Sequence, residues 1–243
     1  MKKIVAIIPA RGGPKNIPGK NTKDFCGKPL IAWSIEVAKK SKYVDRVILS
    51  TDSEEVRRIG VRHGAEAPFL RPSELATDTM GVEPVLKHAY EWLQEHQKYK
   101  ADVLVLLMPT TPTRQAFHID NAIDIILQTN ADSVVAVNET PANHTPYWTL
   151  VRNKAGKVTL WGGADIKNIM TRRQDFPQKC YARNDLVYVL KPKNLYEEKP
   201  NLYGDRVEFY DVPDALRYES DINTPAEWAE SEEKFKKLQQ NHD

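Results

Sequence analysis

The sequence predicts an α/β domain in which a parallel β-sheet carries helices on both faces. Strand and helix signals alternate from an apolar run at residues 3–9 to another at 133–137. These runs are mostly apolar, as expected for strands buried on both faces, and the alternating order requires helical crossovers. With 41% hydrophobic and 28% charged residues among 243, the chain has enough apolar material for a packed core.

The first half of the chain supplies most of these elements. Pro9 ends the first strand, because proline cannot donate to a strand ladder. The cluster Thr51-Asp52-Ser53 is a good N-cap for a helix. In chain order we expect strands at 3–9, 44–50, 103–108 and 133–137, helices at 30–40, 54–63, 82–98 and 119–128, and an extended segment at 65–70.

The pattern changes after residue 137. Residues 138–178 are rich in proline, glycine and tryptophan and contain only short β-like pieces, at 148–151 and 157–160. We interpret them as an inserted lobe within one domain that spans 1–243. Strands at 186–190 and 207–212 and a helix at 225–240 complete the expected fold.

Charge and composition narrow the ligand class. The net charge is +2, but the first 23 residues hold six basic and no acidic side chains, so the rest of the chain carries −4. A concentrated positive patch in a mildly acidic protein favours a small anionic ligand, and argues against nucleic acid. No apolar run reaches the roughly 18 residues of a membrane span, and we expect no secretory signal. Cys26 and Cys180 form no CxxC pair, which is typical of reduced thiols in a cytoplasmic protein.

The loop after the first strand, residues 9–21, is the strongest candidate for a binding site. Ligands of parallel sheets bind beyond the carboxyl ends of the strands. Glycines let backbone N–H groups approach a phosphate, and Arg11, Lys15 and Lys20 add cationic donors. The spacing matches neither a Walker A loop nor GxGxxG. The alternative is a flexible, solvated basic loop.

Residues 8–21 also carry a resemblance. They are similar to the pattern IPARGGSKxIPxKN of the CMP-sugar synthetases, the cytidylyltransferases that activate sialic acid and related nonulosonic acids. Five further segments resemble that family in order along the chain. They are residues 50–53 (its STDS), 70–79 (LRPxELAxDT), 107–114 (LLQPTSPLR), 172–181 (RRQDxPxxY) and 220–224 (DIDT).

The resemblance implies a Rossmann-like, three-layer nucleotidyltransferase fold with a mostly parallel sheet. It implies an enzyme like CMP-N-acylneuraminate cytidylyltransferase, in which a hydroxyl of an acidic sugar attacks the α-phosphorus of CTP and pyrophosphate leaves. It also implies Mg²⁺, a homodimer joined through the inserted lobe, and a role in surface polysaccharide or glycan biosynthesis. No covalent enzyme intermediate is needed, so positioning and charge neutralisation dominate catalysis.

Roles follow from the resemblance, residue by residue. Arg11, Lys15, Lys20 and Asp221 are the expected catalytic residues. The expected nucleotide-binding residues are Ala10, Arg11, Gly12, Gly13, Lys20, Asn21 and Arg71. The expected residues for the acidic-sugar acceptor are Met108, Thr110, Arg173, Gln174 and Asn184.

The metal site departs from the family pattern. The two aspartates of DIDT stand here as Asp221 and Asn223, which alternate in an extended segment and so share one face. Mg²⁺ takes one or two carboxylates together with phosphate oxygens and water. We expect Asp221 and Asn223 to be its ligands. Loss of one negative charge weakens binding unless a substrate group or a nearby acid substitutes for it. The alternative is that Asn223 caps the terminal helix.

Other departures keep different functions open. Pro14 replaces a serine and Val82 stands where serine is common, and both bear on the nucleotide. Met108 replaces glutamine, and residues 184–186 read Asn-Asp-Leu instead of Asn-Gly-Ala, on the acceptor side. A related transferase with another acidic sugar, a phosphonate acceptor or another nucleotide is therefore an alternative. A non-catalytic nucleotide-binding homologue is a third, supported by Asn223.

Overall fold

The computed structural model describes residues 2–13, 16–213, 218 and 220–240. These residues form two compact units, each considered by itself. The first unit comprises Met1–Ala136 and Asn184–Asp243, and the second comprises Val137–Arg183. The insertion expected at 138–178 lies within the second unit.

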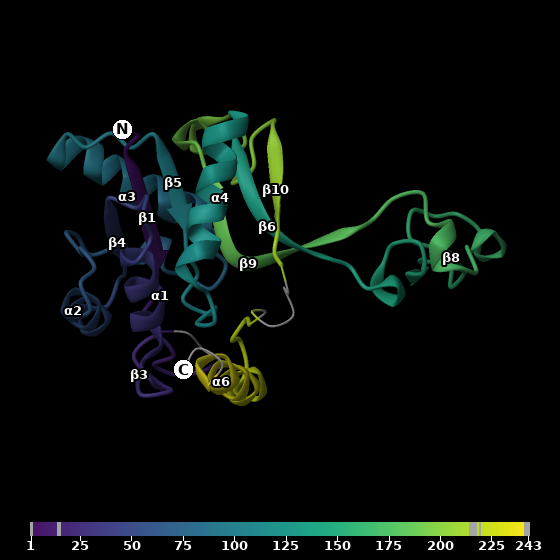
Figure 1. Cartoon of the computed structure of the whole chain (residues 1–243), viewed down its shortest axis with the longest axis horizontal. Helices are drawn as coiled ribbons and strands as arrows, with labels where there is room; N and C mark the ends of the chain where they lie inside the picture. The colour runs from purple at the N-terminus through teal and green to yellow at the C-terminus, as the bar shows by residue number, and fades with distance from the viewer. Residues whose placement is uncertain (1, 14–15, 214–217, 219, 241–243) are drawn as a thin grey trace. The chain divides into compact units, whose positions relative to one another are not determined.

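The first unit is built on a six-stranded sheet of order β10-β6-β9-β5-β1-β4 (Figure 1). β1 (Ile4–Pro9) lies between β4 (Arg46–Ser50) and β5 (Val103–Leu106), and both pairs are parallel. Pro9 pairs with Ser50 at the ends of their strands. The carboxyl ends of these three strands therefore meet at one edge of the sheet.

One strand runs against the expected direction. β9 (Tyr181–Leu190) lies between β5 and β6 (Ser133–Glu139), and it is antiparallel to β5. The chain leaves β6, passes through the second unit and returns without a crossover helix, so β9 enters the sheet from the opposite end. The sheet is mixed and mostly parallel, with β10 (Val207–Asp211) at one edge.

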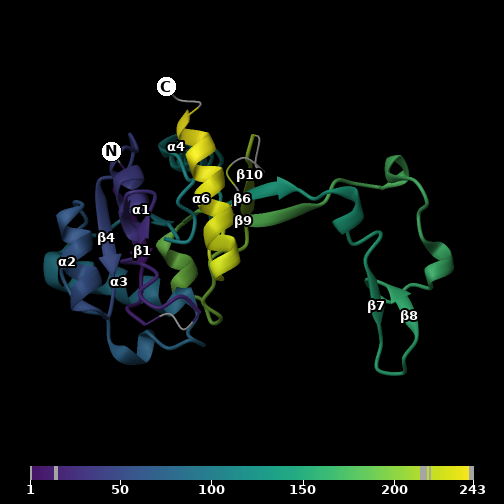
Figure 2. The same ribbon diagram turned by 90° about the horizontal axis from the view of Figure 1, so that it is seen from below.

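Helices cover both faces of this sheet, as Figure 2 shows around β1. Both faces of β1 are apolar, so both need a cover. Ile4, Ala6 and Ile8 point into the core that contains residues of α1 and α4. Val5 and Ile7 alternate with them and are also buried, and α3 packs on the same strand. No helix in the described part of the chain is long and apolar enough to cross a membrane. The helices are α1 (Leu30–Lys39), α2 (Glu54–Arg62), α3 (Val82–Gln97), α4 (Ala116–Thr129) and α6 (Pro225–Gln240).

The boundaries expected from the sequence agree closely with these elements. Ser53 is the N-cap of α2 and accepts a hydrogen bond from the backbone of Val56, as its position predicts. The largest difference is β9, which begins five residues before the expected strand at 186–190. Its first half is polar and exposed, so it lacks the apolar pattern by which a buried strand is recognised.

A second apolar cluster attaches the C-terminal helix to the loop after β1. Phe25, from the short hairpin of β2 (Asp24–Phe25) and β3 (Lys28–Pro29), packs edge-on against Trp228 and Phe235 of α6. Ile17 and Ile222 belong to the same cluster. Packing of α6 therefore carries the segment that precedes it to the loop at the end of β1.

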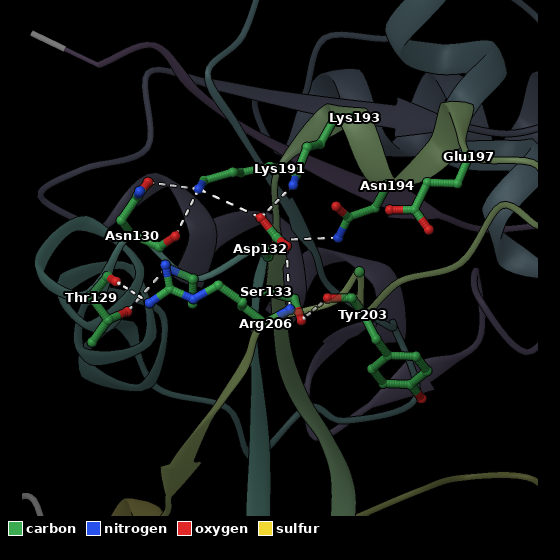
Figure 3. A network of polar contacts seen from close by, with 12 residues as sticks. Thr129, Asn130, Asp132, Ser133, Lys191, Lys193, Asn194, Glu197, Tyr203 and Arg206 are labelled. Carbon is green, nitrogen blue, oxygen red and sulfur yellow. Dashed lines mark hydrogen bonds and ion pairs between the residues drawn. The ribbon is translucent and has the colours of Figure 1, made fainter.

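A polar network closes the far end of the sheet, where β6 and β10 begin and β9 ends (Figure 3). Asp132 is 4% exposed and accepts contacts from Lys193 at 2.7 Å and Lys191 at 3.7 Å. The hydrogen bond from Lys193 lowers the pKa of Asp132. Asn194 donates to the Asp132 carbonyl at 3.1 Å. These bonds hold strand ends together away from the carboxyl edge of β1.

The second unit contains a hairpin of β7 (Leu150–Arg152) and β8 (Val158–Leu160) and several single helical turns. Trp148 donates its indole N–H to the Met170 carbonyl and meets Phe176 edge-on at 5.1 Å. Two aromatics thus pack within the lobe. Trp161 does not, because its side chain is 63% exposed.

A buried histidine gives a test of this fold. His118 is fully buried in α4 and accepts a hydrogen bond from the Gln115 N–H, and burial lowers its pKa to about 3. The unfolded chain therefore binds a proton that the folded chain rejects, and stability falls as pH drops below about 6.5. Between pH 6.5 and 4 this histidine accounts for about 3 kcal/mol of lost unfolding free energy.

We expect His118→Asn to remove that share of the acid sensitivity, as measured by urea unfolding at several pH values. His96→Asn, on the exposed side of α3, is the control and keeps the wild-type slope. An unchanged slope in His118→Asn would contradict the assignment.

Candidate functional site

A pocket of about 260 Å³ opens at the carboxyl ends of β1 and β5, where the sequence placed the ligand. Three segments form most of its wall: the loop after β1, the loop after β5, and the stretch that leads into α3. Its lining residues are Pro9, Arg11, Lys20, Asn21, Arg71, Leu75, Ala76, Thr77, Asp78, Met80, Gly81, Val82, Val85, Met108, Pro109 and Thr110.

Two arginines meet in this pocket and are held by acids from neighbouring segments. Arg11 forms an ion pair with Asp78. The Arg71 side chain is 4% exposed and lies 3.7 Å from Asp52. Burial lowers the pKa of Arg71, and Asp52 partly offsets this effect. The Arg71 Nε is buried without a hydrogen-bond partner among the described residues, so it retains a donor for an incoming anion.

Lys20 and Asn21 connect the first loop to the rest of the site. The Lys20 ammonium donates to the Ile222 carbonyl at 2.7 Å, although 202 positions separate them in sequence. Burial lowers the pKa of Lys20, and the nearby Asp221 carboxylate acts in the opposite sense. The Asn21 amide donates to the Arg11 carbonyl at 2.9 Å and so fixes the loop backbone.

Gly12 allows the closest approach in the loop. Its N–H donates to Asp52 at 3.0 Å, and a Cβ at this position would lie 2.6 Å from the Cβ of Ser53. The glycine is therefore required by the contact with the N-terminus of α2. A Cβ on Gly13 would meet nothing within 4 Å.

Of the other residues predicted to act in this loop, one is described by the structure and one is not. Ala10 is buried in the core, and its N–H donates to the Ser50 carbonyl at 2.9 Å. Lys15 and the substituted Pro14 lie outside the described residues. The nucleotide and catalytic roles of all these loop residues stay predictions.

The loop after β5 is anchored by Arg114, for which no role was predicted from sequence. Arg114 is 1% exposed and has no carboxylate hydrogen-bond partner among the described residues. It donates to the carbonyls of Met108 at 2.8 Å and Asp185 at 3.1 Å, to Leu186, and to the Ser34 hydroxyl. Burial lowers its pKa to about 9. It thereby fixes the pocket loop to β9.

The expected metal residues lie side by side beside the pocket. The amide nitrogen of Asn223 donates to the Asp221 carboxylate at 2.7 Å, so its nitrogen, not its oxygen, faces Asp221. Asn223 and Thr224 donate their backbone N–H groups to the Glu227 carboxylate, and the Thr224 hydroxyl, not the Asn223 side chain, accepts from the Glu227 N–H at the start of α6. In the described residues no group of three or more His, Cys, Asp or Glu could hold a metal ion.

Asp221 fits a cation that completes its shell with substrate oxygens. Asp221 is exposed at the surface, yet partial burial of its carboxylate raises its pKa, and the negative charge of Asp185 raises it further. A carboxylate near the Lys20 ammonium is a hard oxygen ligand of the kind that Mg²⁺ takes.

The expected acceptor residues fall in different parts of the molecule. Met108 and Thr110 line the pocket. The Asn184 side chain accepts from the Leu186 N–H in β9. Arg173 and Gln174 belong to the second unit, where they line a pocket of about 640 Å³ with Phe176 and Thr145.

Sequence reasoning overlooked three residues that shape the site: Asp52, Asp78 and Arg114. All three lie within the segments 50–53, 70–79 and 107–114 that carry the resemblance. A signal was therefore available. An acid near an expected phosphate site looks unfavourable in sequence, and only the fold shows that it orients an arginine.

Comparison with known proteins agrees with this geometry. A family model described as "Cytidylyltransferase" matches residues 5–243. The chain belongs to the cytidylyltransferase family. It is thus a nucleotidyltransferase, as the segment resemblance implied.

Two relatives illustrate the family. The chain is 33% identical over 242 residues to a CMP-N,N'-diacetyllegionaminic acid synthase of Legionella pneumophila, with 95% of each chain covered. It is 40% identical over 199 residues to a pseudaminic acid cytidylyltransferase of Campylobacter jejuni, which covers 81% of this chain and 82% of the relative.

A solved structure confirms the fold. The structure of CMP:2-keto-3-deoxy-manno-octonic acid synthetase complexed with CTP has a TM-score of 0.69 and 19% identity, and the match covers 95% of this chain and 97% of that one. The α/β nucleotidyltransferase fold predicted from the sequence is therefore confirmed.

The steric role of Gly12 can be tested directly. Because an added Cβ must displace Ser53, and overpacking costs about 1–3 kcal/mol, we expect Gly12→Ala to weaken CTP binding about tenfold by calorimetry. Gly13→Ala is the matched control and changes affinity little. Adding Ser53→Gly to Gly12→Ala removes the clashing Cβ and restores binding. Failure of that rescue would show that the contact is not the cause.

The anchoring role of Arg114 gives another test. A lysine cannot reproduce the planar fork, and each buried acceptor left without a partner costs about 1–3 kcal/mol. We expect Arg114→Lys to lower the unfolding free energy in urea by about 3 kcal/mol. Arg58→Lys, exposed on α2, is the control with an effect near zero. Equal stability of the two variants would contradict the anchoring role.

Proposed function

We propose that this cytidylyltransferase couples CTP to an acidic sugar of the nonulosonic class and releases pyrophosphate and a CMP-sugar. The observation that carries the proposal is the pocket at the carboxyl ends of β1 and β5, where Arg11, Lys20 and Arg71 converge on one space. The relatives named above are synthases of CMP-legionaminic acid and cytidylyltransferases of pseudaminic acid, which supports this acceptor class.

The cations suit a triphosphate. Arg71 and Lys20 are partly or fully removed from solvent, and burial lowers the pKa of both, so the protein holds these groups at a cost that a bound anion offsets. Arg11 and Arg71 present planar donor sets that match phosphate or carboxylate oxygens. Asp78 and Asp52 orient them before the nucleotide arrives.

The proposed reaction is a single displacement at the α-phosphorus. The sugar hydroxyl forms a new oxygen–phosphorus bond and loses its proton, and the bond from the α-phosphorus to the bridging oxygen breaks. Pyrophosphate takes the electron pair. The site offers positioning and positive charge for the phosphate oxygens, which is how phosphoryl and nucleotidyl transfers are accelerated.

We include Mg²⁺ in the proposal, with Asp221 as its protein ligand. When bound, the ion supplies positive charge to the triphosphate and orients it. Asn223 stays a predicted ligand whose amide would have to turn its oxygen toward the ion. Lys20, bonded to the Ile222 carbonyl, keeps this segment beside the phosphate loop.

We also propose that the enzyme is a homodimer, with Arg173 and Gln174 acting on the acceptor. Apolar side chains are exposed on the second unit, where Trp161 is 63% and Leu150 48% exposed. Phe209 on the edge strand β10 is 54% exposed. Exposed aromatic and aliphatic groups of this size are typical of surfaces that are covered in an assembly. Light scattering at micromolar concentration tests the homodimer, and a monomer contradicts it.

The cytoplasmic location stays a prediction.

One assay tests the function. The protein is incubated with Mg²⁺, each nucleoside triphosphate and a panel of acidic sugars and phosphonates, and pyrophosphate is measured. We expect release only with CTP and a nonulosonic acid, and loss of turnover in Asp221→Ala. Asp211→Asn, an exposed acid on β10, is the control and keeps activity.

Other outcomes have distinct meanings. Release with another pair supports a different acceptor or nucleotide and overturns the proposed one. Nucleotide binding with no release from any pair supports a non-catalytic homologue.

A further inference from the structure

Asn223 leaves the expected metal segment with one carboxylate, yet a second acid lies nearby. Where the resembling family has glycine in its Asn-Gly-Ala segment, this chain has Asp185. We propose that Asp185 supplies the second carboxylate for the divalent cation held by Asp221. The inference rests on the proposed function. In it, Asp185 on β9 replaces the negative charge that is absent at Asn223.

The backbone places Asp185 at the site through Arg114. One guanidinium nitrogen donates both to the Asp185 carbonyl, at 3.1 Å, and to the Met108 carbonyl, at 2.8 Å. Met108 lines the pocket. Asp185 is therefore fixed against the loop after β5.

The other acid is fixed against the same loop. The Ile222 N–H donates to the Thr110 carbonyl at 3.1 Å, two residues beyond Met108. Asp221, which precedes Ile222, thus lies against the same short loop as Asp185. Lys20 holds this arrangement from the phosphate side through its bond to the Ile222 carbonyl.

The electrostatics agree with this placement. After burial, the negative charge of Asp185 is the strongest influence that raises the pKa of Asp221, and it exceeds the opposing influence of Lys20. Two carboxylates this close repel each other when both are ionised. A divalent cation between them converts the repulsion into attraction.

A third oxygen completes the group. Thr110 is 7% exposed and lines the pocket, and its hydroxyl faces Asp221 and lowers the pKa of that carboxylate. One oxygen of Asp185 accepts the Tyr188 hydroxyl at 2.7 Å, which orients the carboxylate. Two carboxylates with substrate oxygens and water form the ligand set that Mg²⁺ accepts.

The competing explanation is structural: Asp185 would serve only to hold Tyr188. The two explanations differ in what a metal titration shows. Mn²⁺ is titrated into the full chain in the absence of sugar, and binding is monitored as the decrease in the electron-resonance signal of free Mn²⁺. This measures metal affinity without turnover. Thermal unfolding of each variant reports folding separately.

We expect Asp185→Asn to weaken Mn²⁺ binding at least about tenfold, since it removes one charged ligand. Asn223→Asp strengthens binding. The double variant Asp185→Gly with Asn223→Asp moves the carboxylate back to the segment and returns the affinity to within about threefold of wild type. Asp211→Asn, an exposed acid on β10, is the control and leaves Mn²⁺ affinity unchanged.

The proposal is overturned if folded Asp185→Asn binds Mn²⁺ as wild type does. Should Asp185→Asn fail to fold, Asp185→Gly with Asn223→Asp still decides, because a structural acid cannot be replaced from position 223. The proposed function fails independently, through the pyrophosphate assay. A chain that makes CMP-sugar while Asp185→Asn keeps its metal affinity refutes only the present inference.

Discussion

The buried Arg114 guanidinium is the interaction on which the site depends. A charge this deeply buried is costly, as its pKa of about 9 indicates, and no carboxylate hydrogen-bonds to it among the described residues. Its donors are used to tie backbone carbonyls of the loop after β5 and of β9 to one planar group. Because Met108 and Asp185 share that group, the loop after β5 and the antiparallel strand β9 are held together.

Three cationic side chains line the pocket near this anchor, and each of them contacts an acid or a carbonyl of a neighbouring segment. Asp78 and Asp52 orient the two pocket arginines, while Lys20 reaches the Ile222 carbonyl. Such a site is preorganised, so little rearrangement is needed when a polyanion enters. The same preorganisation explains why charged side chains of both signs lie within one small pocket.

The strands, the helices and the position of the loop after β1 could be predicted from the sequence. Strands of continuous apolar residues and helices with one apolar face follow from local periodicity, and the loop after β1 lies at the carboxyl edge by topology alone. The direction of β9 was not accessible, because it depends on how the chain returns from the second unit. The hydrogen-bond partners of Arg114 could not be predicted either, because most of them are backbone carbonyls, which the sequence of side chains does not distinguish. Arg11, Lys20, Arg71, Met108 and Thr110 do share one pocket, but their roles stay predictions.

The bond between Lys20 and Ile222 has a consequence for how the protein is made. It joins positions 202 residues apart, across nearly the whole chain. During synthesis, β1, β4 and β5 can assemble long before residue 222 leaves the ribosome, so the sheet precedes the site. Until then the basic loop lacks its last partner. The bond from Lys20 to Ile222 therefore forms late, once α6 packs on Phe25.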